Sequence, residues 1–204
     1  HRIGAGGEVR VIGRSGLTGT GAALRRRLER EMARAGVEMV EGSAVAVTAE
    51  EVVLADGRRV PARLCVGAGG ATPQPWLRAT DLPLHEGFIK VRDTLQVEGR
   101  DDLFAAGDCA HLTHDPRPKA GVYAVRAAQV LFHNLRARAT GGRLRSFRPQ
   151  RRFLRLVSLG DRRAVAEKWP ALPLAPAGAL VWRWKDHIDR GFMRRFSDLR
   201  PMAP

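Results

Sequence analysis

The stretch "DLFAAGDCAH" (residues 102–111) places a carboxylate directly after a glycine, at the end of an apolar run. In open α/β sheets, ligands bind beyond the carboxyl ends of the strands. Asp108 can accept hydrogen bonds there from the hydroxyl groups of a sugar or a sugar alcohol. Gly107 has no Cβ, so a bulky ligand can approach its backbone closely. The pair therefore predicts a ligand-binding strand end.

A helix predicted over residues 119–142 begins shortly after this pair. Gly141 and Gly142 end it, and an apolar stripe runs along it. The stripe is formed by Val122, Val125, Gln129, Phe132 and Leu135. The first N–H groups of a helix have no partner within the helix, and its N-terminus carries partial positive charge. The region around Lys119 and Ala120 is therefore suited to an electron-rich ring oxygen or a phosphate.

This pair and the side chains near it also have simpler interpretations. A Gly-Asp pair after an apolar run is also common as a turn or a helix cap. We interpret Cys109 as a small packing residue rather than a redox thiol. His111 and His114 form an HxxH pattern in a proline-containing loop, which is a weak metal signature, and we predict no metal site.

An α/β protein with an antiparallel insertion would position these residues. The predicted helix over residues 22–36 has Leu24, Leu28 and Met32 on one face and ends at Gly36. Asp56-Gly57 is typical of a hairpin turn. The predicted strands cover residues 8–13, 37–40, 44–48, 51–54, 58–60 and 63–69, with further short strands in 87–97.

Charge is distributed unevenly along the 204 residues. The net charge is +14, and most of the excess lies after residue 143. Such a region can bind nucleic acid, an anionic membrane surface or an acidic partner, or it can simply be solvated. Basic and aromatic residues do not alternate as they do in RNA-binding strands, so we expect no specific nucleic acid. The sequence contains no run of about 18 apolar residues, so we predict no membrane-spanning helix.

Three segments together resemble the two-dinucleotide-binding flavoproteins, the pyridine nucleotide-disulfide oxidoreductase-like superfamily. "DLFAAGDCAH" with "PKAGVYAVRAAQVLFHNL" resembles its second flavin-binding segment, and "LCVGAGGATPQPWL" resembles its return strand from the nicotinamide domain. The chain is most similar to type II NADH dehydrogenase-like members. Within these, "PRPKAGVYAVR" and "VWRWKDHIDRGFMRRF" resemble the flavoprotein module fused to selenide, water dikinase. The implied fold is the C-terminal half of a Rossmann-like α/β flavoprotein with an antiparallel meander and a basic C-terminal region.

The resemblance implies FAD as cofactor and NAD(P)H as electron donor, with a hydride passing to the flavin and on to an acceptor. Asp108 would bind a ribityl hydroxyl or the adjoining phosphate, and Gly107 would make the close approach. Gly70 and Ala71 would lie near the nicotinamide dinucleotide. The implied cofactor-binding residues are Gly107, Asp108, Lys119, Ala120, Gly121, Val122, Gly70 and Ala71. No catalytic acid or base is identified.

The sequence departs from the family pattern in its glycines. Neither GxGxxG fingerprint is present, because the glycines at 13, 16, 19 and 21 have the wrong spacing and lie one strand too late. We therefore expect the C-terminal half of a longer flavoprotein. Its expected parts are 1–77 from the NAD(P)-binding domain, 78–142 from the FAD-binding domain and 143–204 as a basic interface. No acidic residue ends "EVRVIGR", and Arg14 could meet a 2′-phosphate.

The C-terminal residues 180–199 form an apolar stripe with basic flanks. Its members are Val181, Trp184, Ile188, Phe192, Phe196 and Leu199. Such a helix can lie on an anionic membrane, but Trp182, Asp186 and Asp189 favour packing on the protein body. We expect a cytoplasmic location. A peripheral contact with the inner membrane face is the further option for this location. The expected partner is a small-molecule, quinone-like acceptor. The alternative is a non-catalytic docking or redox-sensing module fused to a selenophosphate-forming kinase domain.

Overall fold

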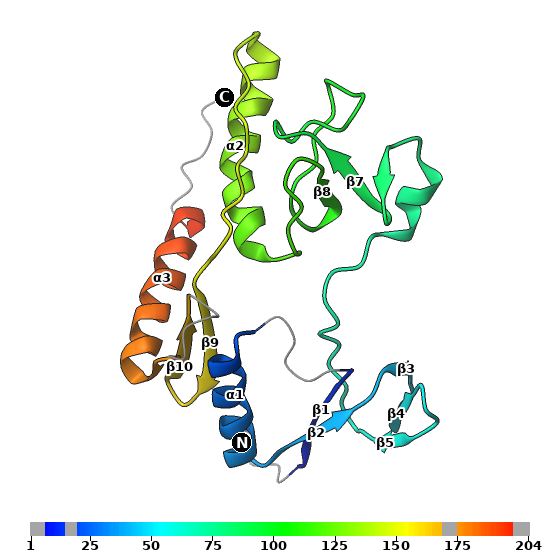
Figure 1. Ribbon diagram of the computed structural model, residues 1–204, viewed down its shortest axis with the longest axis vertical. Coiled ribbons are helices and arrows are strands. Elements are labelled where there is room, and N and C mark those ends of the chain that lie inside the picture. Colours follow the sequence, from blue (N-terminus) through cyan, green and yellow to red (C-terminus); the bar gives the residue numbers. More distant parts are fainter. Residues whose placement is uncertain (1–6, 15–19, 169–174, 198–204) are drawn as a thin grey trace. The chain divides into compact units, whose positions relative to one another are not determined.

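The computed structural model describes residues 7–14, 20–168 and 175–197. The chain forms two compact units (Figure 1). The first unit combines residues 1–66 with 154–204, and the second unit spans residues 67–153. The residues from 154 onwards therefore belong to the same unit as the N-terminal ones, and the domain boundaries expected from the sequence stay a prediction.

The first unit begins with a parallel β-α-β arrangement. Strand β1 (Val9–Gly13), helix α1 (Ala22–Arg34) and strand β2 (Val37–Glu41) follow one another, and β1 pairs in parallel with β2. Leu24 of α1 is fully buried. The predicted strands and helix in this region are confirmed, and their parallel pairing is the pattern of a dinucleotide-binding domain.

An antiparallel meander follows β2. Its strands are β3 (Ala44–Val47), β4 (Glu51–Leu54) and β5 (Arg59–Pro61), paired in the order β3-β4-β5. The hairpin between β4 and β5 turns at Asp56-Gly57, as predicted. Gly57 has φ +86°, which glycine adopts without strain, and the Asp56 carboxylate accepts a hydrogen bond of 3.0 Å from the Arg58 N–H.

The C-terminal part of the first unit is a small antiparallel sheet covered by a helix. The strands are β9 (Arg155–Gly160), β10 (Arg163–Glu167) and β11 (Ala177–Gly178), in the order β11-β10-β9. Helix α3 (Ala179–Ser197) lies along β9 and β10 (Figure 1). The predicted C-terminal helix is thereby confirmed for the described residues, and the predicted stripe residue Leu199 lies outside them.

A buried carboxylate ties this sheet to the start of α1. Glu167 has a side chain that is 3% exposed. Its Oε1 accepts a hydrogen bond of 2.9 Å from the Gly21 N–H, which is at the N-cap of α1. Its Oε2 accepts one of 2.8 Å from Arg155 Nη1. A negative charge at a helix N-terminus interacts favourably with the helix dipole, so Glu167 serves as the cap that α1 lacks locally.

Replacing Glu167 with alanine is expected to lower the free energy of unfolding by about 2 kcal/mol, because a buried N–H and a guanidinium lose their acceptor. Urea unfolding of the full chain measures this change. Glu29→Ala, at an exposed position of α1, is the matched control and should change stability by less than about 0.5 kcal/mol. Equal effects of the two substitutions would contradict the assigned role of Glu167.

The second unit consists of a three-stranded sheet and a long helix. Strands β6 (Leu84–His85), β7 (Phe88–Val91) and β8 (Ala110–Leu112) pair in the order β6-β7-β8, and helix α2 spans Gly121–Thr140. Short 3-10 helices cover Pro75–Ala79 and Gly107–Cys109. Two buried clusters form the core, one around Val91 and Val97 and the other around Leu95, Ala127 and Phe147.

Two predicted strands are not formed. Residues 63–69 have no strand conformation, and Leu64 and Val66 are 83% and 79% exposed. A parallel strand is stabilised by ladder partners on its sides, and no described residue provides them here. The apolar run before Gly107 is extended but pairs only through an isolated bridge between Phe104 and Gln96.

The packed face of α2 also differs from the apolar stripe in the sequence. The buried residues of α2 are Tyr123, Ala127, Asn134 and Ala137. From the stripe, Phe132 is 70% exposed, and Val125 and Leu135 are exposed as well. Asn134 faces the core because its side chain forms hydrogen bonds with backbone groups of Thr94 and Arg145, and hydropathy alone could not reveal this.

Candidate functional site

A solvent-open hollow lies in the second unit where α2 begins. Its wall is formed by the 3-10 turn Gly107–Cys109, strand β8, the loop before α2 and the first turns of α2. Four of the predicted site residues line it: Gly107, Asp108, Lys119 and Ala120. The fold thus brings together two short segments that the sequence separates by a loop.

Gly107 and Asp108 form the turn at one side of the hollow. Gly107 has φ +75°, in the left-handed region. A Cβ there would lie 3.5 Å from the Ala124 Cβ, so space is available but the backbone conformation is strained for other residues. Asp108 is exposed, and among the described residues its carboxylate accepts no hydrogen bond and forms no ion pair. It is therefore available to hydroxyl donors of a ligand.

Lys119 contributes a partly desolvated positive charge. Its Nζ donates a hydrogen bond to the Ala110 carbonyl and lies 4.1 Å from the centroid of the Phe88 ring. Burial lowers the pKa of Lys119, and the negative charges of Asp108 and Cys109 partly oppose this shift. The ammonium group is thus held beside the hollow by a carbonyl and an aromatic face.

Arg117 lines the hollow and was missed in the sequence interpretation. Its side chain is 18% exposed, and its Nη2 donates a hydrogen bond of 2.6 Å to Asp115. Its Nε is buried and has no hydrogen-bond partner in the described part of the chain. A buried donor without a partner is costly, so an acceptor oxygen from a ligand would satisfy it. The available signal was Pro116-Arg117-Pro118, where prolines restrict the backbone on both sides.

The start of α2 is open to a ligand. The N-cap residue Ala120 is extended and provides no side-chain cap. Gly121 and Val122 are the first helical residues, and Gly121 is exposed. Their N–H groups belong to the set that has no acceptor within a helix, so they can bind an oxygen of a ring or a phosphate.

Gly70 and Ala71 are not part of this hollow. Both are exposed in the extended segment before Pro75–Ala79, and Gly70 has φ +88°. The described structure therefore does not bring them together with Asp108. Their assignment to the nicotinamide dinucleotide stays a prediction, as does the assignment of the other residues to FAD.

Two histidines stack on the sheet of the second unit. The ring centroids of His85 and His111 are 4.1 Å apart. Burial lowers the pKa of His111, and the charges of His85, Lys119 and Lys90 lower it further, with Glu86 opposing them. Within the described residues no three His, Cys, Asp or Glu side chains cluster as metal ligands.

The lowered pKa of His111 predicts a pH-dependent stability. The folded state favours neutral His111. The contribution of His111 to the free energy of unfolding is therefore fully present above the unfolded pKa near 6.5, and it is lost as the pH falls toward the folded pKa. We expect His111→Gln to reduce the loss of unfolding free energy between pH 7.5 and pH 5.5. Urea unfolding at both pH values measures it. His133→Gln, in α2 outside this cluster, is the control, and identical pH profiles for the wild type and His111→Gln would contradict the prediction.

The parallel β1-α1-β2 unit, the meander and the hollow at the start of α2 define an α/β dinucleotide-binding protein. The family model "Pyridine nucleotide-disulphide oxidoreductase" matches residues 2–128. The chain belongs to this family. The predicted superfamily and fold class are confirmed, and FAD with NAD(P)H is the cofactor and donor pair that the family indicates.

Curated relatives share short regions with the chain. The potato mitochondrial internal alternative NAD(P)H-ubiquinone oxidoreductase A1 is 31% identical over 80 residues, which cover 39% of this chain and 16% of the relative. Ferroptosis suppressor protein 1 of Xenopus laevis is 30% identical over 103 residues, covering 50% of this chain and 26% of the relative. The chain thus spans about a quarter or less of these relatives.

Solved structures support the same fold. The NAD-dependent persulfide reductase from A. fulgidus aligns with TM-score 0.59 and 24% identity over 78% of this chain and 31% of that protein. A ferredoxin reductase from Rhodopseudomonas palustris aligns with TM-score 0.57 and 22% identity over 80% of this chain and 48% of that one.

The residues around the hollow fit FAD. Asp108 offers a free carboxylate to hydroxyl groups, and Gly107 leaves space beside its backbone. The uncapped start of α2 and the unsatisfied Arg117 Nε are donors without acceptors among the described residues. A flavin dinucleotide carries hydroxyl groups, ring carbonyls and phosphates, which complement these groups.

Proposed function

We propose that the whole protein is an FAD-dependent oxidoreductase that takes a hydride from NAD(P)H and passes electrons to a small-molecule acceptor. The observation that carries this proposal is the hollow beside Gly107-Asp108. There, the buried Arg117 Nε and the first N–H groups of α2 are donors without an acceptor among the described residues. Bound FAD supplies the hydride and electron chemistry. This chain contributes residues from both dinucleotide-binding domains.

Each residue has a role that follows from its chemistry. Asp108 accepts hydrogen bonds from ribityl hydroxyl groups. Arg117 and the first N–H groups of α2 donate to anionic or carbonyl oxygens. The Lys119 ammonium provides positive charge where electron density increases on reduction. Buried Tyr123 and Ala127 form the apolar floor that excludes water.

The proposed acceptor is quinone-like. One relative is named as an NAD(P)H-ubiquinone oxidoreductase, which supports this choice of chemical class. A ferredoxin-type protein acceptor is the competing class, since a matching structure is a putidaredoxin reductase–putidaredoxin complex. Turnover assays with a short-chain quinone and with a ferredoxin distinguish the two acceptors.

The visible absorption spectrum of the full-length protein tests the proposal. We expect a flavin spectrum that bleaches when NADH or NADPH is added without oxygen and returns when a quinone is supplied. A colourless protein that does not take up added FAD would contradict the proposed function.

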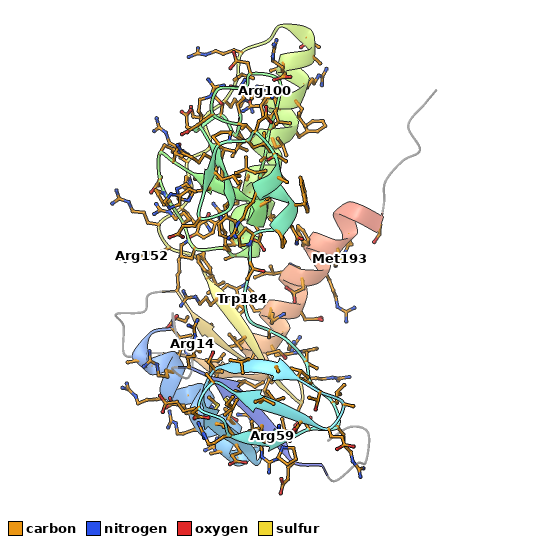
Figure 2. The ribbon with its side chains drawn as sticks, turned by 90° about the vertical axis from the view of Figure 1, so that its right-hand side faces the viewer. Arg14, Arg59, Arg100, Arg152, Trp184 and Met193 are labelled. Carbon is orange, nitrogen blue, oxygen red and sulfur yellow. The ribbon has the colours of Figure 1, made fainter. Side chains whose placement is uncertain are left out.

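We also propose that the protein is cytoplasmic and that it contacts the inner membrane face through α3. Trp184 and Met193, labelled in Figure 2, are 49% and 57% exposed on α3, and Leu180 is also exposed. Val181 and Phe192 are half-buried, so α3 also packs on its own unit. No described helix has the length and hydropathy needed to cross a bilayer. Co-sedimentation with anionic vesicles, weakened by Trp184→Ser, tests this contact.

A second candidate function is docking without catalysis. Exposed Arg162, Arg183 and Arg190 around the C-terminal sheet and helix favour an acidic partner surface. A fused selenophosphate-forming kinase domain is the partner proposed for this alternative. Salt-sensitive binding to such a domain by a protein that never takes up FAD would support docking over the redox function.

A further inference from the structure

Two histidines share one face of the sheet in the second unit. His85 of β6 is the cross-strand partner of Phe88 in β7, and Lys90 of β7 is the partner of His111 in β8 (Figure 1). Alternate residues of a strand point to the same face, and so do directly paired residues of neighbouring strands. The rings of His85 and His111 therefore meet on this face, with their centroids 4.1 Å apart.

Lys119 is held by the two residues that adjoin this histidine pair. Its Nζ donates a hydrogen bond to the carbonyl of Ala110, which directly precedes His111 in β8. The same Nζ lies 4.1 Å from the ring centroid of Phe88, the cross-strand partner of His85. Lys119 also lines the hollow. The lysine thus connects the histidine pair to the hollow.

Charged groups from several neighbouring segments face the histidine pair. Lys90 forms an ion pair of 2.6 Å with Glu98, so these two charges largely cancel. Glu86, in the turn between β6 and β7, is exposed, and water and salt therefore screen its charge. The Lys119 ammonium is partly buried and forms no ion pair within the described part of the chain. Positive charge on the histidines is therefore opposed mainly by Lys119.

Protonation of the pair acts on the position of Lys119. Burial lowers the pKa of His111, and the charges of His85 and then of Lys119 lower it further. Like charges repel one another more strongly in a partly desolvated place than in water. The carboxylate of Asp108 attracts the ammonium in the other direction, since its charge opposes the lowering of the pKa of Lys119. Acid pH thus favours a movement of Lys119 toward Asp108.

We propose that the His85–His111 pair is a pH-sensitive switch that controls FAD binding in the hollow through Lys119. With neutral histidines, Lys119 stays on the Ala110 carbonyl, and Asp108 accepts hydrogen bonds from the ribityl hydroxyl groups. With charged histidines, the ammonium moves to Asp108 and occupies the acceptor oxygens that FAD needs. The inference rests on the proposed function, because it describes the regulation of the same site.

FAD binding and protonation of the pair then oppose each other. By linkage, each reduces the affinity for the other by the same factor. FAD therefore binds more tightly above the pH at which His111 titrates, and this pH lies below the ordinary value of 6.5. A tenfold loss of FAD affinity means that the pKa of the pair is lower by about one in the FAD-bound protein.

Titration of the full-length apoprotein with FAD at pH 7.5 and pH 5.5, followed by flavin fluorescence, tests the switch. We expect the wild type to lose about 10-fold in affinity at the lower pH. His111→Gln should remove most of this loss. His187→Gln, which removes an exposed histidine of α3, is the matched control and should keep the loss. Circular dichroism at both pH values shows whether each variant is folded.

A second measurement follows Lys119 itself and needs no flavin. The lysines of the full-length protein are dimethylated with ¹³C-formaldehyde, which keeps their charge, and Lys119→Arg identifies the Lys119 resonance. We expect this resonance to shift as His111 titrates in the wild type. The shift should be absent in His111→Gln and retained in His187→Gln.

An FAD affinity that is independent of pH, or a pH dependence that survives His111→Gln, overturns the inference while leaving the proposed function intact. A Lys119 resonance that does not follow His111 overturns it as well. If the protein takes up no FAD at either pH, the proposed function fails. The Lys119 resonance then decides alone: a shift that depends on His111 supports the switch, and its absence overturns it.

Discussion

Replacing Asp108 with alanine is expected to yield full-length protein that loses FAD during purification. The carboxylate is exposed beside the hollow and accepts no hydrogen bond from the described residues, so its acceptor capacity is available to the cofactor. Hydrogen bonds to a charged acceptor contribute about 1.5–3 kcal/mol each. We therefore expect FAD affinity to fall roughly 10- to 100-fold for one lost bond, and further if two are lost.

Titration of apoprotein with FAD, followed by flavin fluorescence, measures this loss. Asp108→Asn keeps one acceptor oxygen and should bind with intermediate affinity. Asp81→Ala is the matched control, since Asp81 is an exposed carboxylate of the same unit outside the hollow. Wild-type FAD affinity in Asp108→Ala would show that the hollow is not the flavin site.

Asn134→Leu is expected to produce the largest loss of stability, about 4 kcal/mol. Asn134 is 0% exposed in α2. Its Nδ2 donates hydrogen bonds of 2.8 Å to the carbonyls of Thr94 and Arg145, and its Oδ1 accepts one of 2.8 Å from the Arg145 N–H. A leucine would leave three backbone groups without partners in a buried place, and each costs about 1–3 kcal/mol.

Urea unfolding of the full chain measures this change. Asn134→Asp should also be destabilising, because a carboxylate cannot donate to the two carbonyls. Gln129→Leu makes a similar polar-to-apolar change on the exposed side of α2 and should be nearly neutral. A loss below about 1 kcal/mol in Asn134→Leu would mean that water or a backbone shift replaces these bonds.

Local signals in the sequence predicted most of the secondary structure. The hairpin at Asp56-Gly57 follows from its turn residues, and α1 follows from the spacing of its leucines and from Gly36. These predictions succeed because turn geometry and helix periodicity depend on neighbouring residues. The strand expected over residues 63–69 failed for the converse reason, since a strand needs partners that its own sequence does not contain.

The candidate site was predictable where the motif is local. Gly107-Asp108 and the start of α2 were found because a turn glycine, a carboxylate and a helix start are recognisable in a short window. Arg117 was not found, because an unsatisfied Nε becomes visible only when burial is known. The assignment of Gly70 and Ala71 depends on chain geometry that the described structure does not bring to the hollow.

The sequence by itself determined the family, the three helices, the strands β1 to β5 and the glycine–aspartate turn, because these depend on residue type and short spacing. Only the tertiary structure decided which face of α2 is buried, since Asn134 is held by backbone groups as distant as Thr94. It also decided that Glu167 caps α1 across 146 residues of chain. Such contacts form only when burial makes an unpaired polar group costly, and that cost is a property of the folded interior.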